Sequence, residues 1–434
     1  MAHFTFLIPR QTDDLLKSSI NDDYYVKNVS VQKDIPNELK GCRLSLREEG
    51  AEFILDSFDT YFSVLHHGDS LSMALIYQAF EDLHKGAIEL NKALGFLLDD
   101  KDNLNDETTA KYKNILKMLI YLYTQIVLLL EKRVLAKKEQ QISLKGKKKS
   151  VKDADEEFYV DKKSVLLILN NIIQREISLF WDDQAIEETF INTISGICYE
   201  FLQNPSVKKE KEEFNEIFNV LGYLMKAYNH GTTFIVRITQ LIKLHEHLIH
   251  CVPNGIKYLV QNFNYKRLLH EFIEELTEWQ TDERHQDAQG SRHCATVLSS
   301  LAALLPDLMM PEVVSLNNYL YYEPASLRIS VIMVMVEVIL SNLTNDELDD
   351  EQRKFRDELF GILMEHSEDV SAMVRAKVFN QWARLQKEMA IPLKFQLQVL
   401  EICVEHLRDK GPLARKFAAH CVTTFLSCNG FSSN

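Results

Sequence analysis

The 434-residue sequence predicts an all-α solenoid of stacked antiparallel helix pairs, and three observations support this prediction. Glycine (14 residues) and proline (9 residues) make up about 3% and 2% of the chain, against a usual share of roughly 7% and 5%, which favours long helices with short connections. From Glu52 onward apolar residues recur at three- and four-residue steps, as on one face of an amphipathic helix. Finally, a pattern with an arginine at the start of an apolar helix occurs four times, around Arg292, Arg328, Arg375 and Arg415.

The four arginines are 36, 47 and 40 residues apart, close to the period of roughly 40–47 residues in HEAT-type helix pairs. Asp369 and Asp409 precede Arg375 and Arg415 by six residues. We expect each aspartate to lie in the turn within a repeat and cap the second helix, and each arginine to bridge to the aspartate of an adjacent repeat. A generic helical bundle with coincidental Asp–Arg pairs is the alternative. The buried stripe of one such helix would contain Val374, Val378 and Trp382.

Composition limits the possible locations and partners. The net charge of −14 excludes binding of nucleic acid by the bulk charge of the molecule, so such binding requires a local basic surface. Seven scattered cysteines without a CxxC pair are typical of reduced thiols in the cytosol or nucleus. The amino terminus lacks the features of a signal peptide. The most apolar stretch, Met118–Leu130, is shorter than the roughly 18–20 residues of a membrane span, so we expect a buried helix in a soluble protein.

The sequence predicts six regions along the chain. These are an irregular N-terminal arm (1–50), an N-terminal helical region (51–140), a charged lysine-rich loop (141–162), a helical array (163–280), a loop (281–288) and HEAT repeats (289–434) without a polar capping repeat, as in a truncated solenoid. Helices before the last region are expected at 71–98, 108–138, 163–181, 184–203, 211–228 and 232–251, and the helical period weakens between about 252 and 288.

No motif indicates an enzyme, a cofactor or a metal site. Leu244–Cys251 reads LHEHLIHC, but an HExxH zinc site needs histidines four residues apart, and Ile249 stands where the second would be. Gly146–Ser150 reads GKKKS without the first glycine or the strand of a P-loop. GxSxG and GxGxxG are absent from the sequence. We therefore predict no catalytic, cofactor-binding or metal-binding residues.

One segment is strongly basic. Between Glu131 and Lys152 nine lysines and arginines stand against two glutamates, a local net charge of +7. The DNA-binding candidates in it are Lys145, Lys147, Lys148, Lys149 and Lys152. A nuclear-import signal or a solvated loop explains the same charge. The arginines at 328, 375 and 415 form an alternative ladder for DNA, but their regular pairing with aspartates favours a structural role.

Several longer stretches resemble the D-type HEAT subunit family of condensin I, condensin complex subunit one, in its amino-terminal portion. The similarity runs in order through nearly the whole chain. The stretches are FLIPRQTDDLLKSS near the start, LDSFDTYFSVLHH (55–67), AIEETFINTISGICYEFLQNPSV (185–207), FRDELFGILMEHSEDVSAMVRAKVFNQWARL (355–385) and LRDKGPLARKFAAHCVTTFLSCNGFS (407–432). One departure from the family pattern is Gly411-Pro412 with Ala414 ahead of Arg415, which leaves the geometry of that turn open.

The resemblance implies a non-catalytic scaffold subunit acting in mitotic chromosome condensation. Its partners would be a kleisin subunit, the SMC (structural maintenance of chromosomes) ATPase subunits, the other HEAT subunit of condensin and DNA, without a membrane. It would reside in the nucleus and on mitotic chromosomes, with a cytoplasmic pool. A second hypothesis is a peptide-binding HEAT adaptor for transport or phosphatase assembly, although the three tryptophans do not follow the repeat spacing such a groove requires. A third, a helical enzyme, lacks an assembled site.

Overall fold

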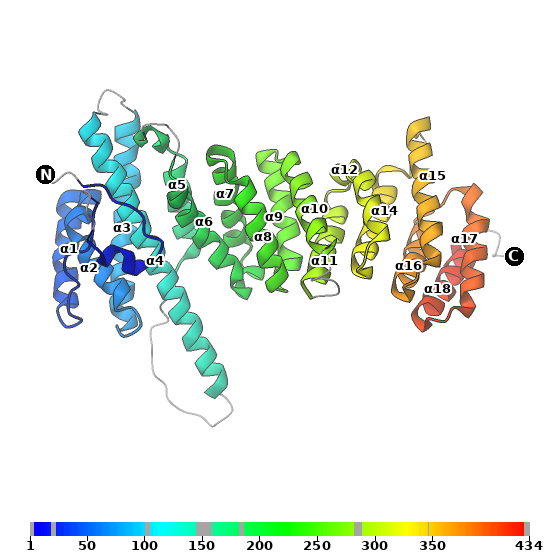
Figure 1. Cartoon of the computed structure of the whole chain (residues 1–434), viewed down its shortest axis with the longest axis horizontal. Helices are drawn as coiled ribbons and strands as arrows, with labels where there is room; N and C mark the ends of the chain where they lie inside the picture. The colour runs from blue at the N-terminus through cyan, green and yellow to red at the C-terminus, as the bar shows by residue number, and fades with distance from the viewer. Residues whose placement is uncertain are drawn as a thin grey trace. The chain divides into compact units, whose positions relative to one another are not determined.

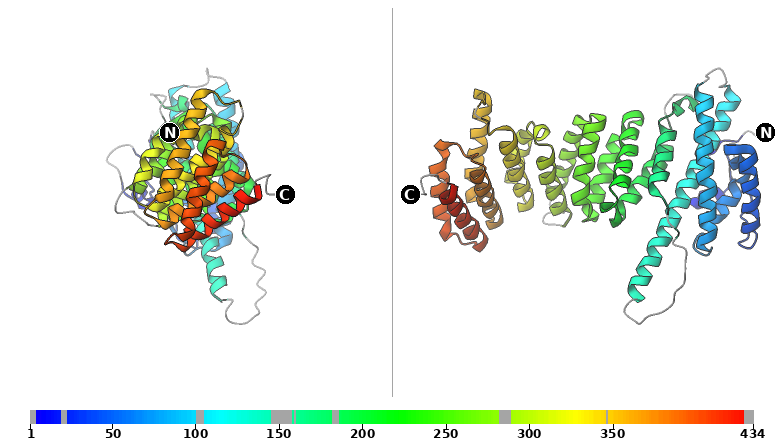
Figure 2. Two further views of the ribbon diagram at one scale, coloured as in Figure 1. Left: turned by 90° about the vertical axis from the view of Figure 1, so that its right-hand side faces the viewer. Right: turned by 180° about the vertical axis from the view of Figure 1, so that it is seen from behind.

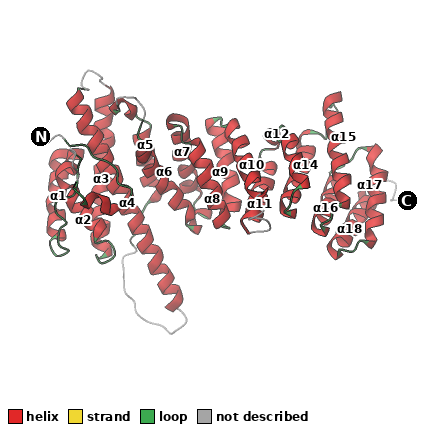
Figure 3. Ribbon diagram, viewed as in Figure 1, coloured by secondary structure: helices red, strands yellow, loops and turns green. Residues whose placement is uncertain are grey.

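The computed structural model describes residues 4–18, 23–99, 105–144, 158, 160–181, 186–281, 289–345 and 347–428 (Figure 1). Within these ranges the chain is helical, and the only extended pairing is an isolated parallel bridge between Thr5 and Asp23 (Figure 3). The all-α prediction is confirmed. The chain folds as two compact units, residues 1–230 and 231–434.

The first unit stacks its helices in two layers. In one layer α2 packs on α4 and α4 on α6, and in the other α3 packs on α5 and α5 on α7. This is the arrangement of helix pairs that share their apolar faces with the next pair. The helices of this unit are α1 (Ile35–Glu49), α2 (Ile54–His66), α3 (Met73–Asp99), α4 (Asp106–Leu144), α5 (Lys162–Ile173), α6 (Glu188–Gln203) and α7 (Lys211–Tyr228).

Helix α4 is the core helix of this unit. Met118, Tyr123 and Leu130 are buried, as the apolar stretch predicted. The carboxyl-terminal part of α4 extends beyond the neighbouring α3 and α5 (Figure 2). Both α4 and α14 (Ala325–Asn342) are long and apolar enough to cross a membrane, but 72% and 61% of their most apolar windows are buried inside the protein. They are therefore packed as core helices of the solenoid.

The N-terminal arm lies on α2 and α4. Asn114 on α4 accepts a hydrogen bond from the Phe6 amide (2.9 Å) and donates one to the Phe4 carbonyl (2.7 Å). The Phe6 ring is fully buried and contacts Phe58 with ring centroids 5.1 Å apart. Residues 1–50 are less irregular than predicted, because α1 begins at Ile35. The weak periodicity of this helix reflects its mostly polar sequence, of which only four side chains are buried.

The second unit also stacks helices in succession. Helix α11 packs on α14, α14 on α16 and α16 on α18, while α17 packs beside α18. Helix α15 approaches α17 through Phe360 and Phe395, whose stacked rings are 5.5 Å apart. The helices are α8 (Gly231–Leu244), α9 (Leu248–Phe263), α10 (Lys266–Thr281), α11 (Gln289–Leu304), α12 (Pro306–Met309), α13 (Val313–Leu316), α14 (Ala325–Asn342), α15 (Asp350–Glu365), α16 (Ala372–Lys387), α17 (Leu393–Glu405) and α18 (Pro412–Cys428).

Three expectations about element boundaries were wrong. The stretch 252–288 is not weakly structured, because α9 and α10 occupy most of it. Its pattern was obscured by Pro253 near the start of α9 and by Asn264, which ends α9 in a left-handed conformation (φ 59°). The expected helix 232–251 is interrupted after Leu244, and the expected helix 163–181 ends at Ile173, followed by a short 3-10 turn.

The boundary between the two compact units lies at residues 230 and 231, inside the region 163–280 that the sequence assigned to one helical array. The physical reason is that α8, α9 and α10 all pack against α11, so the loop joins helices of one core. Residues 282–288 of that loop lie outside the described residues, as do residues 145–157 of the lysine-rich loop.

Candidate functional site

The turns within the repeats of the second unit are joined by a ladder of arginine–aspartate pairs. Nε and Nη2 of Arg375 donate to the two carboxylate oxygens of Asp409 at 2.8 and 2.7 Å. Arg328 binds Asp369 in the same bidentate manner, with hydrogen bonds of 2.9 and 3.0 Å. Each pair connects one repeat to the next along α14, α16 and α18. Such bidentate pairs fix geometry because the planar guanidinium matches the carboxylate.

The two aspartate-bearing turns have the same backbone conformation. Asp369 adopts φ −51° and ψ 145°, and Asp409 adopts φ −54° and ψ 148°. The Gly411-Pro412 departure therefore leaves the turn geometry unchanged. Each carboxylate also accepts a hydrogen bond from an amide two residues ahead, Ser371 (2.7 Å) or Gly411 (2.6 Å). This contact lies at the residue preceding the helix rather than in its first turn, so the aspartate orders the turn instead of capping the helix directly.

Arg375 and Arg415 each also contact the aspartate that lies six residues before them in the sequence. Nη1 of Arg375 donates to the carbonyl of Asp369 at 2.6 Å, and Nη1 of Arg415 donates to the carbonyl of Asp409 at 2.7 Å. Each of these arginines thus binds the backbone of its own turn. Arg375 uses its other two nitrogens for the next repeat. Arg292 in α11 is exposed and has no such place in the described ladder.

The ladder is largely removed from solvent. The side chains of Arg328 and Asp369 are 7% and 6% exposed, and those of Arg375 and Asp409 are 14% and 4% exposed. The hydrogen bonds from Arg375 lower the pKa of Asp409 to about 2. Because Arg328 is buried, Arg375 is mostly covered and both are paired with aspartates, their guanidinium groups are not available to DNA phosphates. The stripe of Val374, Val378 and Trp382 is fully buried, as predicted.

The lysines proposed for DNA binding, Lys145, Lys147, Lys148, Lys149 and Lys152, lie outside the residues that the structure describes. The nearest described part of the basic segment is on α4. There Lys132 is exposed, whereas Arg133 donates to the carbonyls of Gly68 and Leu71 and so holds the turn between α2 and α3.

The histidines of Leu244–Cys251 do not share one helix. His245 and His247 lie in the turn between α8 and α9, and their ring centroids are 5.6 Å apart, while His250 is exposed on α9. Among the residues that the structure describes, no group of three or more metal-ligating side chains is gathered.

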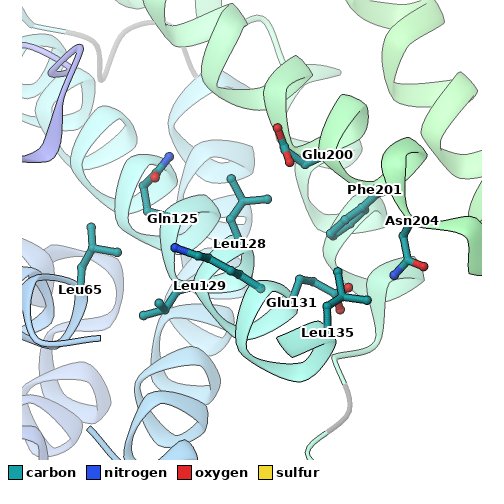
Figure 4. Close-up of a pocket in the computed structure, with 10 residues that line it drawn as sticks. Leu65, Gln125, Leu128, Leu129, Glu131, Leu135, Glu200, Phe201 and Asn204 are labelled. Carbon is teal, nitrogen blue, oxygen red and sulfur yellow. The ribbon is translucent and has the colours of Figure 1, made fainter. Parts of the chain in front are cut away.

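A groove between α4 and α6 was not foreseen from the sequence. Its volume is about 400 Å³, and Figure 4 shows the side chains that line it. Leu128, Leu129 and Leu135 line it from α4, at the spacing of one helix face, and Phe201 lines it from α6. Glu200 and Lys132 stand at its rim. The sequence gives little indication of this groove, because its two walls are about 70 residues apart in the chain. The apolar residues of each wall, taken alone, are typical of a buried helix face.

The stacked helix pairs and the ladder between their turns define the chain as a HEAT-type repeat protein. Comparison with known families adds a more particular relationship. Residues 75–234 match the family described as non-SMC mitotic condensation complex subunit 1, N-term. The chain is similar to condensin complex subunit 1, and the resemblance seen in the sequence is confirmed.

The match extends over nearly the whole chain. It is 30% identical to condensin complex subunit 1 of Xenopus laevis over 433 residues, covering 99% of this chain and 32% of the relative. The mouse and human proteins of the same name are each 29% identical, covering 99% of this chain and 31% of their own lengths. The chain thus spans about a third of the length of these relatives. Among solved structures, the karyopherin Kap121p bound to the C-terminus of Cdc14p has 11% identity and a TM-score of 0.31, covering 96% of this chain and 42% of that chain, which is too low to support an inference.

Proposed function

We propose that the chain is a non-catalytic scaffold subunit of a condensin complex and acts in mitotic chromosome condensation. The observation that carries this proposal is the similarity to condensin complex subunit 1 over 99% of the chain. The fold supports it, because stacked helix pairs present long surfaces to partners. Its place would be the nucleus and mitotic chromosomes, with a cytoplasmic pool.

The proposed partners are a kleisin subunit, the SMC ATPase subunits, the other HEAT subunit and DNA. For kleisin we propose the groove between α4 and α6 as one contact. Leucines at helical spacing and Phe201 form an apolar floor, and the charged lining residues are Glu200, Lys132 and Glu131, the last of which is paired with Lys162. An amphipathic kleisin segment with leucine-like anchors and a charge of each sign would match this arrangement.

For DNA we propose the lysines of the basic segment at 145–152. Phosphate contacts by lysines depend strongly on salt, because counterions are released from the duplex. A whole-molecule charge of −14 makes such a local segment necessary. Among the residues that the structure describes, Trp181 and Trp382 are buried in helix packing rather than arrayed along a groove, which disfavours the adaptor alternative.

The test is a pull-down of kleisin peptides by the full chain, at two salt concentrations and with or without duplex DNA. The proposal expects one kleisin segment to be retained at both salt concentrations, and DNA to be retained at low salt only. A variant with Lys147, Lys148 and Lys149 changed to glutamine should lose DNA and keep kleisin. If no kleisin segment is retained by the unmodified chain, the scaffold proposal fails.

A further inference from the structure

A small basic hollow lies between α1 and α3 in the first unit. It has a volume of about 370 Å³ and is lined by Arg43, Leu46, Arg47, Gly50, Lys85 and Glu89. Three cationic side chains therefore converge with one carboxylate in a chain whose net charge is −14. This local excess of positive charge runs against the charge of the whole molecule and points to an anionic ligand.

The charged side chains of the hollow come from one face of α1 and one face of α3. Arg43 and Arg47 are four residues apart on α1, and Lys85 and Glu89 are four residues apart on α3, so each pair lies on one side of its helix. Helices α1 and α3 pack against each other, which brings the two pairs to one place. Gly50, at the end of α1, turns the chain with φ 60°.

Arg43 is held in place by the buried side chain of Asp82. Its Nε donates to Oδ1 of Asp82 at 2.8 Å, and the Asp82 side chain is fully buried in α3. Nη2 of Arg43 and Oδ2 of Asp82 are buried without a hydrogen-bond partner. About a third of the Arg43 side chain remains exposed. An arginine fixed in this way needs little ordering when a ligand arrives.

The two other cationic side chains of the hollow, Arg47 and Lys85, remain accessible to a ligand. Arg47 and Lys85 are exposed, and neither forms an ion pair with a residue that the structure describes. The one carboxylate of the hollow, Glu89, is paired with Lys92 at 2.8 Å, which weakens its repulsion of an anion. The hollow thus offers a fixed guanidinium and two free cations to one small anionic group.

A phosphoryl group satisfies this arrangement best. It carries a charge of about −1.5 to −2 near neutral pH and three strong acceptor oxygens, and arginine binds it with particular geometric fit. Duplex DNA carries its charge along an extended backbone and is bound by many cations over a broad surface. Here the cations surround a single small concavity, whereas the proposed DNA contact belongs to the separate basic segment at 145–152. We propose that the Arg43–Arg47–Lys85 hollow binds the phosphoryl group of a phosphorylated serine or threonine on a partner protein.

The test uses the full chain and a short peptide with a central phosphoserine, compared with the same peptide carrying serine or glutamate. Binding is followed by the phosphorus NMR signal of the phosphopeptide and by fluorescence anisotropy for all three peptides. The proposal expects saturable binding of the phosphopeptide only. The double variant Arg47→Gln with Lys85→Gln should weaken it by tenfold or more, since one charge-assisted hydrogen bond contributes about a factor of ten.

The matched control is Lys33→Gln, which removes one exposed positive charge just before α1, at the end of that helix away from Gly50 and outside the lining of the hollow. It should leave the affinity within about twofold, as expected of an exposed charge. Lowering the pH from 7.5 to 5 should weaken binding severalfold, because the second phosphate pKa is about 6. Equal binding of the three peptides, equal losses in the double variant and the control, or loss of duplex DNA binding in place of phosphopeptide binding would each overturn the proposal.

Discussion

The guanidinium of Arg375 and the carboxylate of Asp409 form two parallel hydrogen bonds, 2.8 and 2.7 Å long, between the turns of successive repeats. The same arginine donates its remaining nitrogen to the carbonyl of Asp369 in its own turn. Asp369 in turn accepts two hydrogen bonds from Arg328 of the preceding repeat. Each of these turns therefore depends on its neighbour, and the ladder adds to the apolar contacts and to the ion pairs Arg384–Glu337 and Lys394–Asp357 that also join the repeats.

Replacing Arg375 with alanine should destabilise the second unit by about 3 kcal/mol, because it leaves the buried carboxylate of Asp409 without its partner. The measurement is urea denaturation followed by circular dichroism. Arg415→Ala is the control, since Arg415 is exposed and donates to the carbonyls of Asp409 and Lys410. Its expected cost is about 1 kcal/mol. Equal losses for the two variants would show that the bridge between repeats contributes nothing.

The stability of the second unit should depend on the ionisation of Asp409. Its pKa is about 2 in the folded protein and has an ordinary value of 3.8, so the folded state favours the carboxylate. The resulting stabilisation is present above about pH 4 and is lost as the pH falls toward 2. The advantage of the unmodified chain over Asp409→Asn should therefore shrink between pH 5 and pH 2.5. A constant difference in urea midpoint over this range would contradict the assigned cause.

Gly411 should tolerate no side chain. A Cβ atom added there would lie 2.6 Å from the Cβ of Ala372, the first residue of α16 in the preceding repeat. Gly411→Ala should therefore lower stability by about 1–3 kcal/mol, the usual cost of overpacking. Adding Ala372→Gly to this variant should restore part of the loss, measured in a double-mutant cycle.

Gly361 provides the matched control for this substitution. It lies inside α15, and nothing stands within 4 Å of an added Cβ. Gly361→Ala should therefore raise stability by roughly 0.5–1 kcal/mol, because alanine is the better helix former. A loss at position 361 similar to that at position 411 would remove the steric explanation.

Changing Leu135 to glutamate should reduce kleisin binding without unfolding the chain. Leu135 lines the groove between α4 and α6 and is 38% exposed, so the folded state accepts a charge there, whereas an apolar partner does not. A loss of tenfold or more is expected, as for an anchor in an apolar pocket. Leu44→Glu on α1, at 57% exposure and outside the groove, is the control. Unchanged binding by the Leu135 variant would exclude this groove as the contact.

Local patterns predicted most helices of the first unit and the arginine ladder of the second. The stripe of Val374, Val378 and Trp382 follows directly from helical periodicity, and the recurring arginines are visible because each lies in the same turn of successive repeats. Helix α9 was missed because Pro253 and the left-handed Asn264 resemble breaks in a sequence, although packing against α11 maintains the helix.

Contacts between side chains of different stacked helices could not be predicted from the sequence. Leu135 and Phe201 meet in the groove only because α4 packs on α6, and each alone is typical of a buried core position. The same holds for Arg47 and Lys85, which are ordinary exposed cations on their own helices. Charge runs such as 145–152 are visible in a sequence, whereas convergent charges from two helices are not.

The central claim, that this chain serves a condensin complex as a scaffold, is tested most directly by affinity purification of the full chain from mitotic cells followed by quantitative mass spectrometry. The account predicts that one kleisin and two SMC ATPases co-purify in amounts comparable to the chain itself. Recovery of transport cargoes or phosphatase subunits in their place, with kleisin and SMC proteins at background, would contradict it.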